Sequence, residues 1–119
     1  MAYAVTAPMP DVPQSTPALS VVIASHDAAA AIAICLRALA PQCREGDVEV
    51  IVADSSTDDT PAIVTREFPW VRLLHVDAPL TVPALRGRAI QMARGALIAI
   101  LDPYSVAADD WVTRVIEAH

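Results

Sequence analysis

The sequence contains no lysine, and all eight of its basic residues are arginine. Without lysine, the chain can form no Schiff base through an ε-amino group, and it lacks the lysine on which a P-loop depends. Glycine occurs only at positions 46, 87 and 95, so a glycine-rich loop that wraps a phosphate is excluded as well. Aromatic residues make up only 4% of the chain, so alanine, valine, isoleucine and leucine must build the core. This composition favours a Rossmann-like α/β layering over an aromatic-rich β-sandwich.

Cysteine and long apolar runs are also scarce. Cys35 and Cys43 have no nearby histidine or second cysteine pair, so they cannot form a zinc site and are expected to be reduced, structural thiols. No apolar run approaches the about 20 residues that cross a bilayer. Residues 1–17 lack a basic start and are broken by four prolines, unlike a signal peptide. We expect a Pro-rich, disordered leader over residues 1–17, one domain over residues 18–119 and no transmembrane segment.

The charge balance is acidic, with 14 acidic against eight basic residues and a formal net charge of −6. Proteins that bind the phosphate backbone of nucleic acids usually present a basic face, so no nucleic-acid partner is expected. Hydrophobic residues make up 55% of the 119-residue chain, which is enough for one packed domain. We expect a cytoplasmic location, with the inner face of the membrane as the alternative.

Four short apolar runs predict buried strands, at residues 19–24, 48–53, 71–76 and 96–101. Helical patterns separate them, and this alternation predicts parallel β-α-β units. Asp27 is expected to cap a helix that Pro41 ends, and Pro61 is expected to start a second helix. A third helix would bury one face and end at Gly95, and a fourth would begin near Asp109 and Asp110; the buried face consists of Leu85, Ala89, Met92 and Ala93.

Each of the four predicted strands is followed by an aspartate. These residues are Asp27, Asp54, Asp77 and Asp102. Parallel sheets bind ligands at the carboxyl ends of their strands, so the aspartates mark the candidate site. Asp54 has no local partner apparent in the sequence, and its carboxylate suits a ribose hydroxyl or a base N–H. For residues 56–59, capping of the next helix is the favoured interpretation.

Two further positions leave alternatives open. Asp102 suits a divalent cation that bridges a diphosphate, but Asp102 with Pro103 is equally typical of a turn. Arg86 opens the third helix, where a guanidinium favours phosphate, whereas Arg88 is interpreted as part of a solvated face. His26 and His75 are interpreted as loop or strand histidines rather than ligands.

Four motifs in series resemble the N-terminal half of a family 2 glycosyltransferase with the GT-A fold. Residues 20–27 read SVVIASHD, where the family has a strand of the form SVVIPTYN. Residues 49–60 read EVIVADSSTDDT, one residue shorter than the family motif and without its glycine. Residues 86–95 read RGRAIQMARG and lead through a strand to Asp102, where the family has its D-x-D motif. The DDW at residues 109–111 is similar to the start of the family's next helix, so the resemblance covers residues 19–119.

The resemblance implies a Rossmann-like GT-A fold with a parallel sheet, present only as its N-terminal half. It implies transfer of a sugar from a nucleotide-diphospho-sugar to an acceptor, with Mg²⁺ or Mn²⁺ as cofactor. The implied nucleotide-sugar-binding residues are Ser25, Asp27, Asp54, Arg86 and Asp102, with Asp102 also at the metal. Tyr104 stands where the family has its second acidic residue. No catalytic base can be named, because the family carries it in the second half.

The sequence leaves one alternative function open and disfavours two others. A noncatalytic nucleotide-binding α/β module is the alternative to a transferase. A Rossmann dehydrogenase is disfavoured because residues 25–28 contain no glycine where a pyrophosphate would approach the backbone. A receiver-like phosphoacceptor domain would need a lysine that the chain lacks. An incomplete sheet would also favour self-association or a partner chain that completes the fold.

Overall fold

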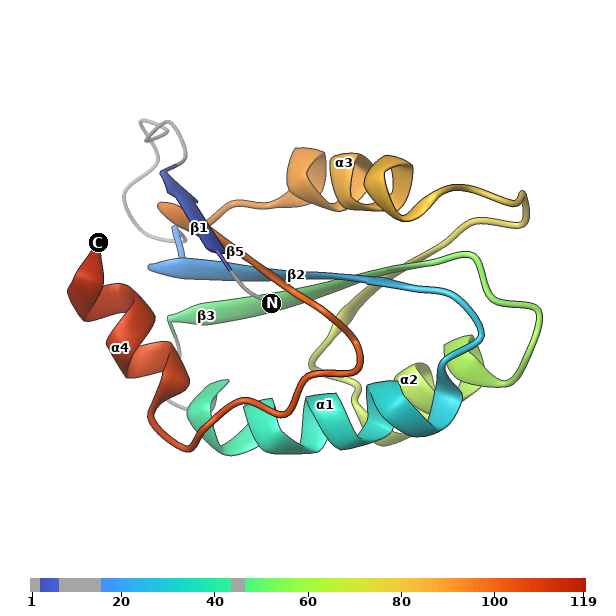
Figure 1. Cartoon of the computed structure of the whole chain (residues 1–119), viewed down its shortest axis with the longest axis horizontal. Helices are drawn as coiled ribbons and strands as arrows, with labels where there is room; N and C mark the ends of the chain where they lie inside the picture. The colour runs from blue at the N-terminus through green and yellow to red at the C-terminus, as the bar shows by residue number, and fades with distance from the viewer. Residues whose placement is uncertain (1–2, 7–15, 44–46) are drawn as a thin grey trace.

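The computed structural model describes residues 3–6, 16–43 and 47–119, which form a five-stranded sheet in the order β1-β5-β2-β3-β4 (Figure 1). Strands β5, β2, β3 and β4 are parallel to one another. The strand bounds are β1 Tyr3–Thr6, β2 Leu19–Ser25, β3 Val48–Asp54, β4 Arg72–His75 and β5 Leu97–Leu101. The four strands predicted from the sequence are therefore confirmed, with ends that differ by one residue.

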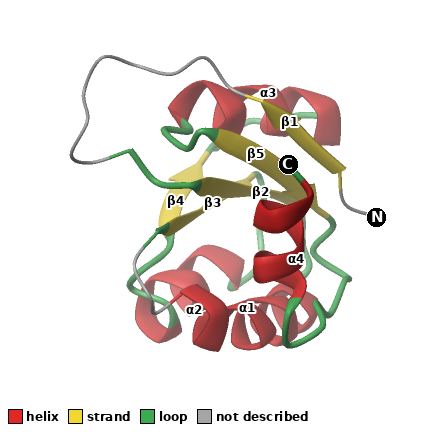
Figure 2. Ribbon diagram, turned by 90° about the vertical axis from the view of Figure 1, so that its left-hand side faces the viewer, coloured by secondary structure: helices red, strands yellow, loops and turns green. Residues whose placement is uncertain are grey.

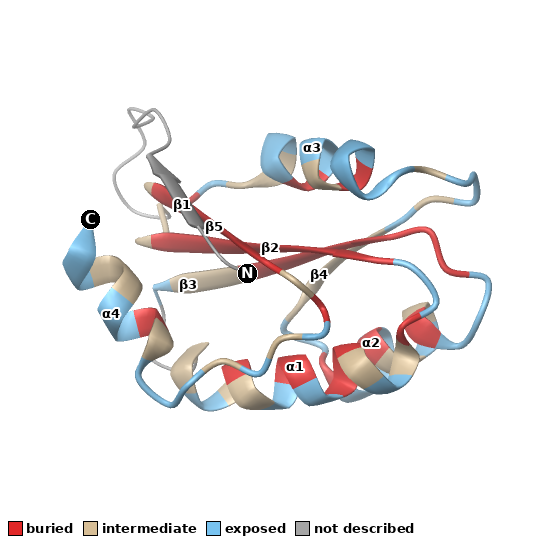
Figure 3. Ribbon diagram, viewed as in Figure 1, coloured by how far each residue is buried: buried red, intermediate tan, exposed pale blue. Residues whose placement is uncertain are grey.

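Helices cover both faces of the sheet (Figures 1 and 2). One face carries α1 (Ala29–Cys43), α2 (Thr60–Glu67) and α4 (Trp111–Ala118), and the other carries α3 (Val82–Met92). Side chains of β2 alternate between the two faces of the sheet. Val21 and Ile23 pack in the core beneath α1, α2 and α4, whereas Val22 and Ala24 pack in the core beneath α3. The central strands are buried on both faces, as Figure 3 shows, which explains their continuous apolar sequence.

Strand β1 was not predicted from the sequence. Residues 3–6 pair antiparallel with β5, and Ala4 lies opposite Ala99. The prediction of a disordered leader is therefore wrong for these four residues. Strand β5 would otherwise expose a row of unpaired backbone groups at the sheet edge, and a four-residue segment without proline can pair with it. The other parts of that predicted leader at residues 1–2 and 7–15 lie outside the described residues.

Helix α1 differs from the prediction at both ends. Asp27 does not cap it, because its backbone has a φ of 45° and the carbonyl of Ala28 accepts the first hydrogen bond, from Ile32. Pro41 does not end the helix either, since it lies within the last turn. Pro41 removes only the backbone hydrogen bond that its own N–H would donate, and the helix continues two residues beyond it to Cys43.

Helix α3 buries the predicted face. Leu85 and Ala89 are fully buried, and Met92 and Ala93 pack against the same core. The helix ends at Met92, before Gly95, so Gly95 is not its terminator. The N–H of Gly95 instead donates to Ser20 Oγ at 2.8 Å, which ties the turn after α3 to the start of β2.

Helix α4 begins after Asp110, close to the predicted start, but no acidic side chain caps it. The side-chain amide of Gln42 on α1 takes that role. Its Oε1 accepts from the N–H of Val112 at 2.8 Å, and its Nε2 donates to the carbonyl of Ala108 at 2.8 Å. The packing of α1 against α4 thus supplies a cap that the local sequence does not contain.

Both cysteines are free, as expected. Burial raises the pKa of the Cys43 thiol to about 11, and burial together with the nearby charge of Asp102 raises that of Cys35 to about 11. Both therefore remain protonated thiols at neutral pH. Within residues 3–6, 16–43 and 47–119, no helix is long and apolar enough to span a bilayer.

Candidate functional site

A cleft of about 510 Å³ opens at the carboxyl edge of the parallel sheet. Its walls come from three segments that follow neighbouring strands: His26 after β2, residues 55–58 after β3, and residues 75–79 at the end of β4. Pro61, at the start of α2, completes the lining. The cleft therefore lies where a parallel α/β sheet is expected to bind a ligand.

Asp27 joins two of these segments. Its N–H donates to Ser56 Oγ at 2.7 Å, and its Oδ1 accepts from the N–H groups of Thr57 at 2.8 Å and Asp58 at 3.3 Å. The φ of 45° places Asp27 in the left-handed region, which aspartate tolerates better than most residues. This unusual conformation turns the carboxylate toward the loop after β3, so Asp27 shapes the cleft by holding that loop.

Asp54 is fully buried and has three donors. Its Oδ2 accepts from the N–H of Ser56 at 3.1 Å and from His75 Nδ1 at 2.9 Å, and its Oδ1 accepts from Ser56 Oγ. The expectation that Asp54 lacks a local partner is wrong. The loop folds back over the carboxylate, and the β3–β4 register places His75 directly opposite Asp54. Asp54 therefore stands behind the wall of the cleft.

His75 links that buried carboxylate to the rim. Its Nε2 lies 2.9 Å from Asp77 Oδ1, and the Asp77 side chain is 97% exposed. The hydrogen bond with Asp54 raises the pKa of His75, burial opposes this effect, and Asp77 raises the pKa further. His75 is the last residue of β4, so its interpretation as a strand histidine is confirmed, but it also lines the cleft.

Asp58 organises the two helices that begin beside the cleft. Its Oδ1 accepts from the N–H of Thr60 at 2.9 Å and from Thr60 Oγ1, and its carboxylate also accepts from the N–H of Ala29. Burial opposes ionisation, but these hydrogen bonds hold the pKa of Asp58 below its ordinary value. The capping interpretation for residues 56–59 is confirmed at Asp58, whereas Asp59 makes no side-chain capping bond.

Ser25, Arg86 and Asp102 are not among the residues that line the cleft, although the carbonyl of Ser25 accepts a hydrogen bond from the N–H of Ser55, which does line it. Ser25 Oγ and Arg86 Nε are buried, and neither has a hydrogen-bond partner among the described residues. Asp102 is half-buried, and its Oδ1 accepts from the N–H of Tyr104 at 2.7 Å, as in the predicted turn. Across the described part of the chain, no group of three or more histidine, cysteine, aspartate or glutamate side chains is placed to hold a metal ion.

The residues predicted from the sequence include two that hold the cleft in place, but not the two histidines that line it. Asp27 and Asp54 hold the loop at residues 55–58, but neither lines the cleft itself. His26 and His75 were not predicted as site residues, but both line the cleft. Their positions at or just after strand ends were the available signal, since every strand end in a parallel sheet faces the same edge.

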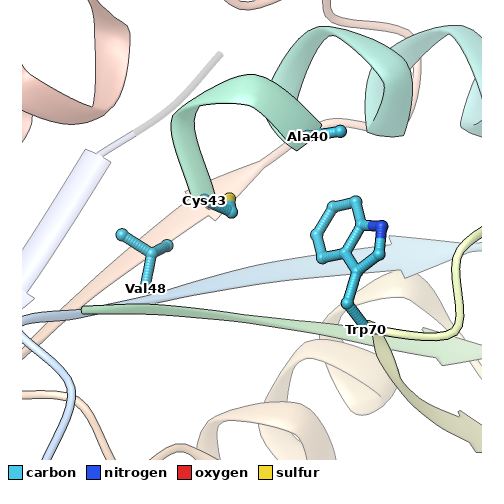
Figure 4. A pocket seen from close by; sticks show the side chains of 4 residues that line it. All are labelled: Ala40, Cys43, Val48 and Trp70. Atoms are coloured by element: carbon cyan, nitrogen blue, oxygen red, sulfur yellow. The ribbon is translucent and has the colours of Figure 1, made fainter. Parts of the chain in front are cut away.

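A second pocket, of about 320 Å³, lies at the opposite end of the sheet (Figure 4). It is lined by Ala40 and Cys43 of α1, Val48 at the start of β3, and Trp70. Because burial keeps the Cys43 thiol protonated, this pocket presents no ionised nucleophile. The cleft at the carboxyl edge is therefore the candidate functional site.

A family model described as glycosyl transferase family 2 matches residues 20–119. The chain belongs to this family. Validoxylamine A glucosyltransferase of Streptomyces hygroscopicus subsp. limoneus is 33% identical over 118 residues, which are 95% of this chain and 26% of that protein. Succinoglycan biosynthesis protein ExoO of Rhizobium meliloti is 36% identical over 104 residues, which are 85% of this chain and 29% of that protein. The resemblance read from the four motifs is thus confirmed.

A solved structure of a mannosyltransferase matches the fold of this chain. The mannosyltransferase PcManGT from Pyrobaculum calidifontis, in complex with GDP-Man and Mn²⁺, superposes with a TM-score of 0.69 and 26% sequence identity. The match covers 88% of this chain and 32% of that chain. The predicted Rossmann-like GT-A fold is confirmed, and this chain spans about a quarter to a third of the length of these proteins.

Substitutions at Asp27 should separate its backbone role from its side-chain role. Asp27→Ala is expected to cost about 1–2 kcal/mol of unfolding free energy, because alanine resists a positive φ and removes the acceptor for Thr57 and Asp58. Asp27→Gly should cost less, since glycine adopts this φ freely, and Asp27→Asn should cost least, because it keeps an acceptor oxygen. Urea unfolding of the three variants measures this order. Equal losses in all three would contradict it.

Proposed function

We propose that this chain is the nucleotide-sugar-binding part of a family 2 glycosyltransferase, which transfers a sugar from a nucleotide-diphospho-sugar to an acceptor. One observation carries the proposal: the cleft lies at the carboxyl edge of a parallel sheet, within the residues that match the family. The mannosyltransferase with the same fold was solved with GDP-Man and Mn²⁺.

We assign the nucleoside to the cleft between residues 55–58 and residues 75–79. These segments offer hydroxyl groups, backbone groups and carboxylates that suit a base and a ribose. Asp27 and Asp54 act behind this wall, because their carboxylates hold residues 56–58. Ser25 Oγ, at the end of β2, is a further polar group with no partner among the described residues.

We assign the diphosphate to Arg86, in the first half of α3. Its Nε is buried without a hydrogen-bond partner in the described structure, so this guanidinium retains a donor for an anionic ligand. Arginine binds phosphate with paired, charge-assisted hydrogen bonds. Arg88, two residues further along the same helix, is exposed and serves as the matched control.

The described residues do not form a metal site by themselves. Asp102 provides one carboxylate, and one of its oxygens already accepts the N–H of Tyr104. Mg²⁺ and Mn²⁺ prefer several oxygen ligands and give up water reluctantly. We propose that a divalent cation binds at Asp102 only together with the diphosphate of the donor, whose oxygens supply further ligands.

Manganese binding should therefore depend on the nucleotide. We expect the wild-type chain to bind Mn²⁺ weakly alone and about tenfold or more tightly with nucleoside diphosphate, with the same factor for the nucleotide when Mn²⁺ is present. Tyr104 is 70% exposed, so Tyr104→Asp should fold normally and raise the affinity for Mn²⁺ alone. Titration of Mn²⁺ monitored by electron paramagnetic resonance measures both effects. Tight binding of Mn²⁺ to the nucleotide-free wild type would contradict the one-carboxylate interpretation.

The acceptor, the catalytic base and the location in the cell belong to the whole protein. We propose that the base comes from a segment outside this chain or from a partner chain, which deprotonates an acceptor hydroxyl for attack on the sugar. We also propose a cytoplasmic location, with the inner face of the membrane as the alternative. The alternative candidate is a noncatalytic nucleotide-binding module.

The proposal is tested by calorimetry with GDP-mannose, UDP-glucose and the corresponding nucleoside diphosphates. At least one of these nucleotide sugars should bind, and its nucleoside diphosphate should compete. Arg86→Gln should weaken that binding about tenfold or more, because a charge-assisted hydrogen bond is lost, whereas Arg88→Gln should not. Absence of binding by the whole panel would refute the proposal. Sugar transfer by the isolated 119-residue chain would refute both the external base and the noncatalytic module.

A further inference from the structure

His75 uses both of its ring nitrogens on carboxylates. Nδ1 lies 2.9 Å from Asp54 Oδ2, and Nε2 lies 2.9 Å from Asp77 Oδ1. An ionised carboxylate can only accept hydrogen bonds, whereas a neutral imidazole has a single N–H to donate. Both contacts can be hydrogen bonds to ionised carboxylates only if His75 is an imidazolium. With both carboxylates ionised, the two contacts place an imidazolium between Asp54 and Asp77.

The bridge connects a fixed part of the cleft to its rim. Asp54 is completely buried at the end of β3 and is held by Ser56, whereas Asp77 is 97% exposed in the segment that follows β4. The His75 side chain, 29% exposed, spans the distance between them and itself lines the cleft. Loss of the bridge would release the rim at residues 77–79 from the buried loop and leave Asp54 without its charged partner.

Other charged groups around His75 are engaged elsewhere. His75 lies on the sheet face of Leu73, which packs in the core beneath α1 and α2. The charged side chains of α2 are Arg66 and Glu67, and Glu67 forms ion pairs with both Arg66 and Arg37 of α1. Helix α3, with Arg86 and Arg88, covers the opposite face.

Two other titratable residues line the same cleft. His26 contacts Ser55 and Asp27, and Asp58 accepts from Thr60. In the described structure, Asp54 and Asp77 are thus the charged groups in contact with His75. These two carboxylates therefore determine whether the imidazole of His75 keeps its second ring proton.

The protonation of His75 also changes the charge that a ligand meets. An imidazolium offsets one of the two negative charges of Asp54 and Asp77, but a neutral imidazole leaves both uncompensated. The chain as a whole carries a formal net charge of −6. An anionic diphosphate entering the cleft is repelled by that charge, so local neutralisation favours its binding.

Resting on the function proposed above, we propose that His75 is a positioning residue that makes nucleotide-sugar binding depend on pH: its imidazolium bridges Asp54 and Asp77 and holds the cleft in its binding form. The bridge fixes the loop after β3 relative to the rim, and it removes a negative charge from the path of the diphosphate.

The direction of the pH effect follows from the two carboxylates. The hydrogen bond with Asp54 raises the pKa of His75 above its ordinary value, burial opposes this, and Asp77 adds to the increase. A raised pKa in the folded state means that the bridge is complete below the ordinary pKa of about 6.5. The bridge is lost as the pH rises through the raised pKa.

The test is calorimetry with GDP-mannose and UDP-glucose at about pH 6 and about pH 8.5, a range in which the diphosphodiester of these probes does not titrate. We expect the wild-type affinity to fall about tenfold across this range, as for the loss of a charge-assisted contact. His75→Gln should bind weakly at both pH values. His119→Gln, at the exposed final residue, is the matched control and should retain the wild-type dependence on pH.

An NMR titration of the imidazole signals measures the bridge without a ligand. His75 should titrate above the ordinary value in the wild type, and Asp77→Asn should lower its midpoint, because it keeps an acceptor but removes the charge. Since Asp77 is 97% exposed, this variant should remain folded. His26→Gln and His119→Gln assign the signals. An unchanged midpoint in Asp77→Asn would overturn the bridge.

The outcomes separate this inference from the proposed function. Nucleotide-sugar binding that is equal at the two pH values, or unaffected by His75→Gln, overturns the role of His75 and leaves the proposed function standing. Failure of every probe to bind at either pH overturns the proposed function and with it the role of His75. A fall in affinity with pH that persists in His75→Gln assigns the effect to another group and also overturns the inference.

Discussion

Glu49→Ala is expected to lower the free energy of unfolding by about 3 kcal/mol or more, because it removes a nearly buried carboxylate that several donors share. The Glu49 side chain is only 9% exposed. Its carboxylate accepts from Ser20 Oγ, from Arg72 at 2.8 Å and from the N–H of Arg94 at 2.6 Å. Alanine would leave Ser20 Oγ and the N–H of Arg94 without this acceptor, and Arg72 would keep only its bond to the carbonyl of Met92. These contacts lie where β2, β3, β4 and the turn after α3 meet.

The dependence on pH provides an independent check. Burial opposes ionisation of Glu49, but the hydrogen bonds from Ser20, Arg94 and Arg72 outweigh it and hold its pKa below the ordinary value. The contribution of Glu49 to the free energy of unfolding is therefore fully present above the ordinary pKa of about 4.5, and it is lost as the pH falls through the lowered pKa.

The experiment is urea unfolding of wild type and Glu49→Ala at neutral pH and at acid pH. The difference between the two proteins should shrink on acidification. Glu117→Ala, at an exposed position on α4, is the matched control and should change stability little. A loss for Glu49→Ala no larger than that of the control would show that the contacts of Glu49 contribute no net stability.

Gly95→Ala is expected to destabilise the chain by about 3 kcal/mol, because the added methyl group has no space. A Cβ at this position would lie 2.6 Å from both the backbone nitrogen and Oγ of Ser20, and 2.8 Å from the carbonyl carbon of Leu19. Two of these three atoms belong to the backbone of β2, the central strand, so they cannot move aside cheaply. The shift would also weaken the hydrogen bond from the N–H of Gly95 to Ser20.

The matched control is Gly87→Ala, the same substitution on α3. A Cβ there would meet no atom within 4 Å, and the position is exposed. Because alanine favours a helix over glycine, this variant should be more stable than wild type by about 0.5–1 kcal/mol. Opposite signs for the two variants in thermal or urea unfolding are the expected result. A mild effect of Gly95→Ala would mean that β2 and the turn can separate without loss of packing.

Local chemistry was enough to predict the repeating part of the fold. The four apolar runs became β2, β3, β4 and β5 because strands covered on both faces need apolar side chains at nearly every position. The spacing of Leu85 and Ala89 likewise identified the buried face of α3, since helical periodicity is a property of the segment itself. The family motifs lie on the same elements, so the family and its fold were also readable from the sequence.

Features that depend on distant partners could not be read in this way. Strand β1 exists because β5 offers it an open edge, and α4 is capped by Gln42 from α1. Asp54 looked unpartnered along the chain, yet the β3–β4 register brings His75 to its carboxylate.

The sequence by itself thus determined the order of the four parallel strands and the helices between them, the glycosyl transferase family 2 membership and the edge of the sheet that carries the cleft. Apolar periodicity and strand-end aspartates are local features of the sequence, so they can be recognised without knowing which residues lie across the sheet. Only the tertiary structure decided which side chains line the cleft and which stand behind it. That division depends on strand register and loop packing, which join residues about 20 to 30 positions apart, such as Asp54 with His75 and Asp27 with Thr57.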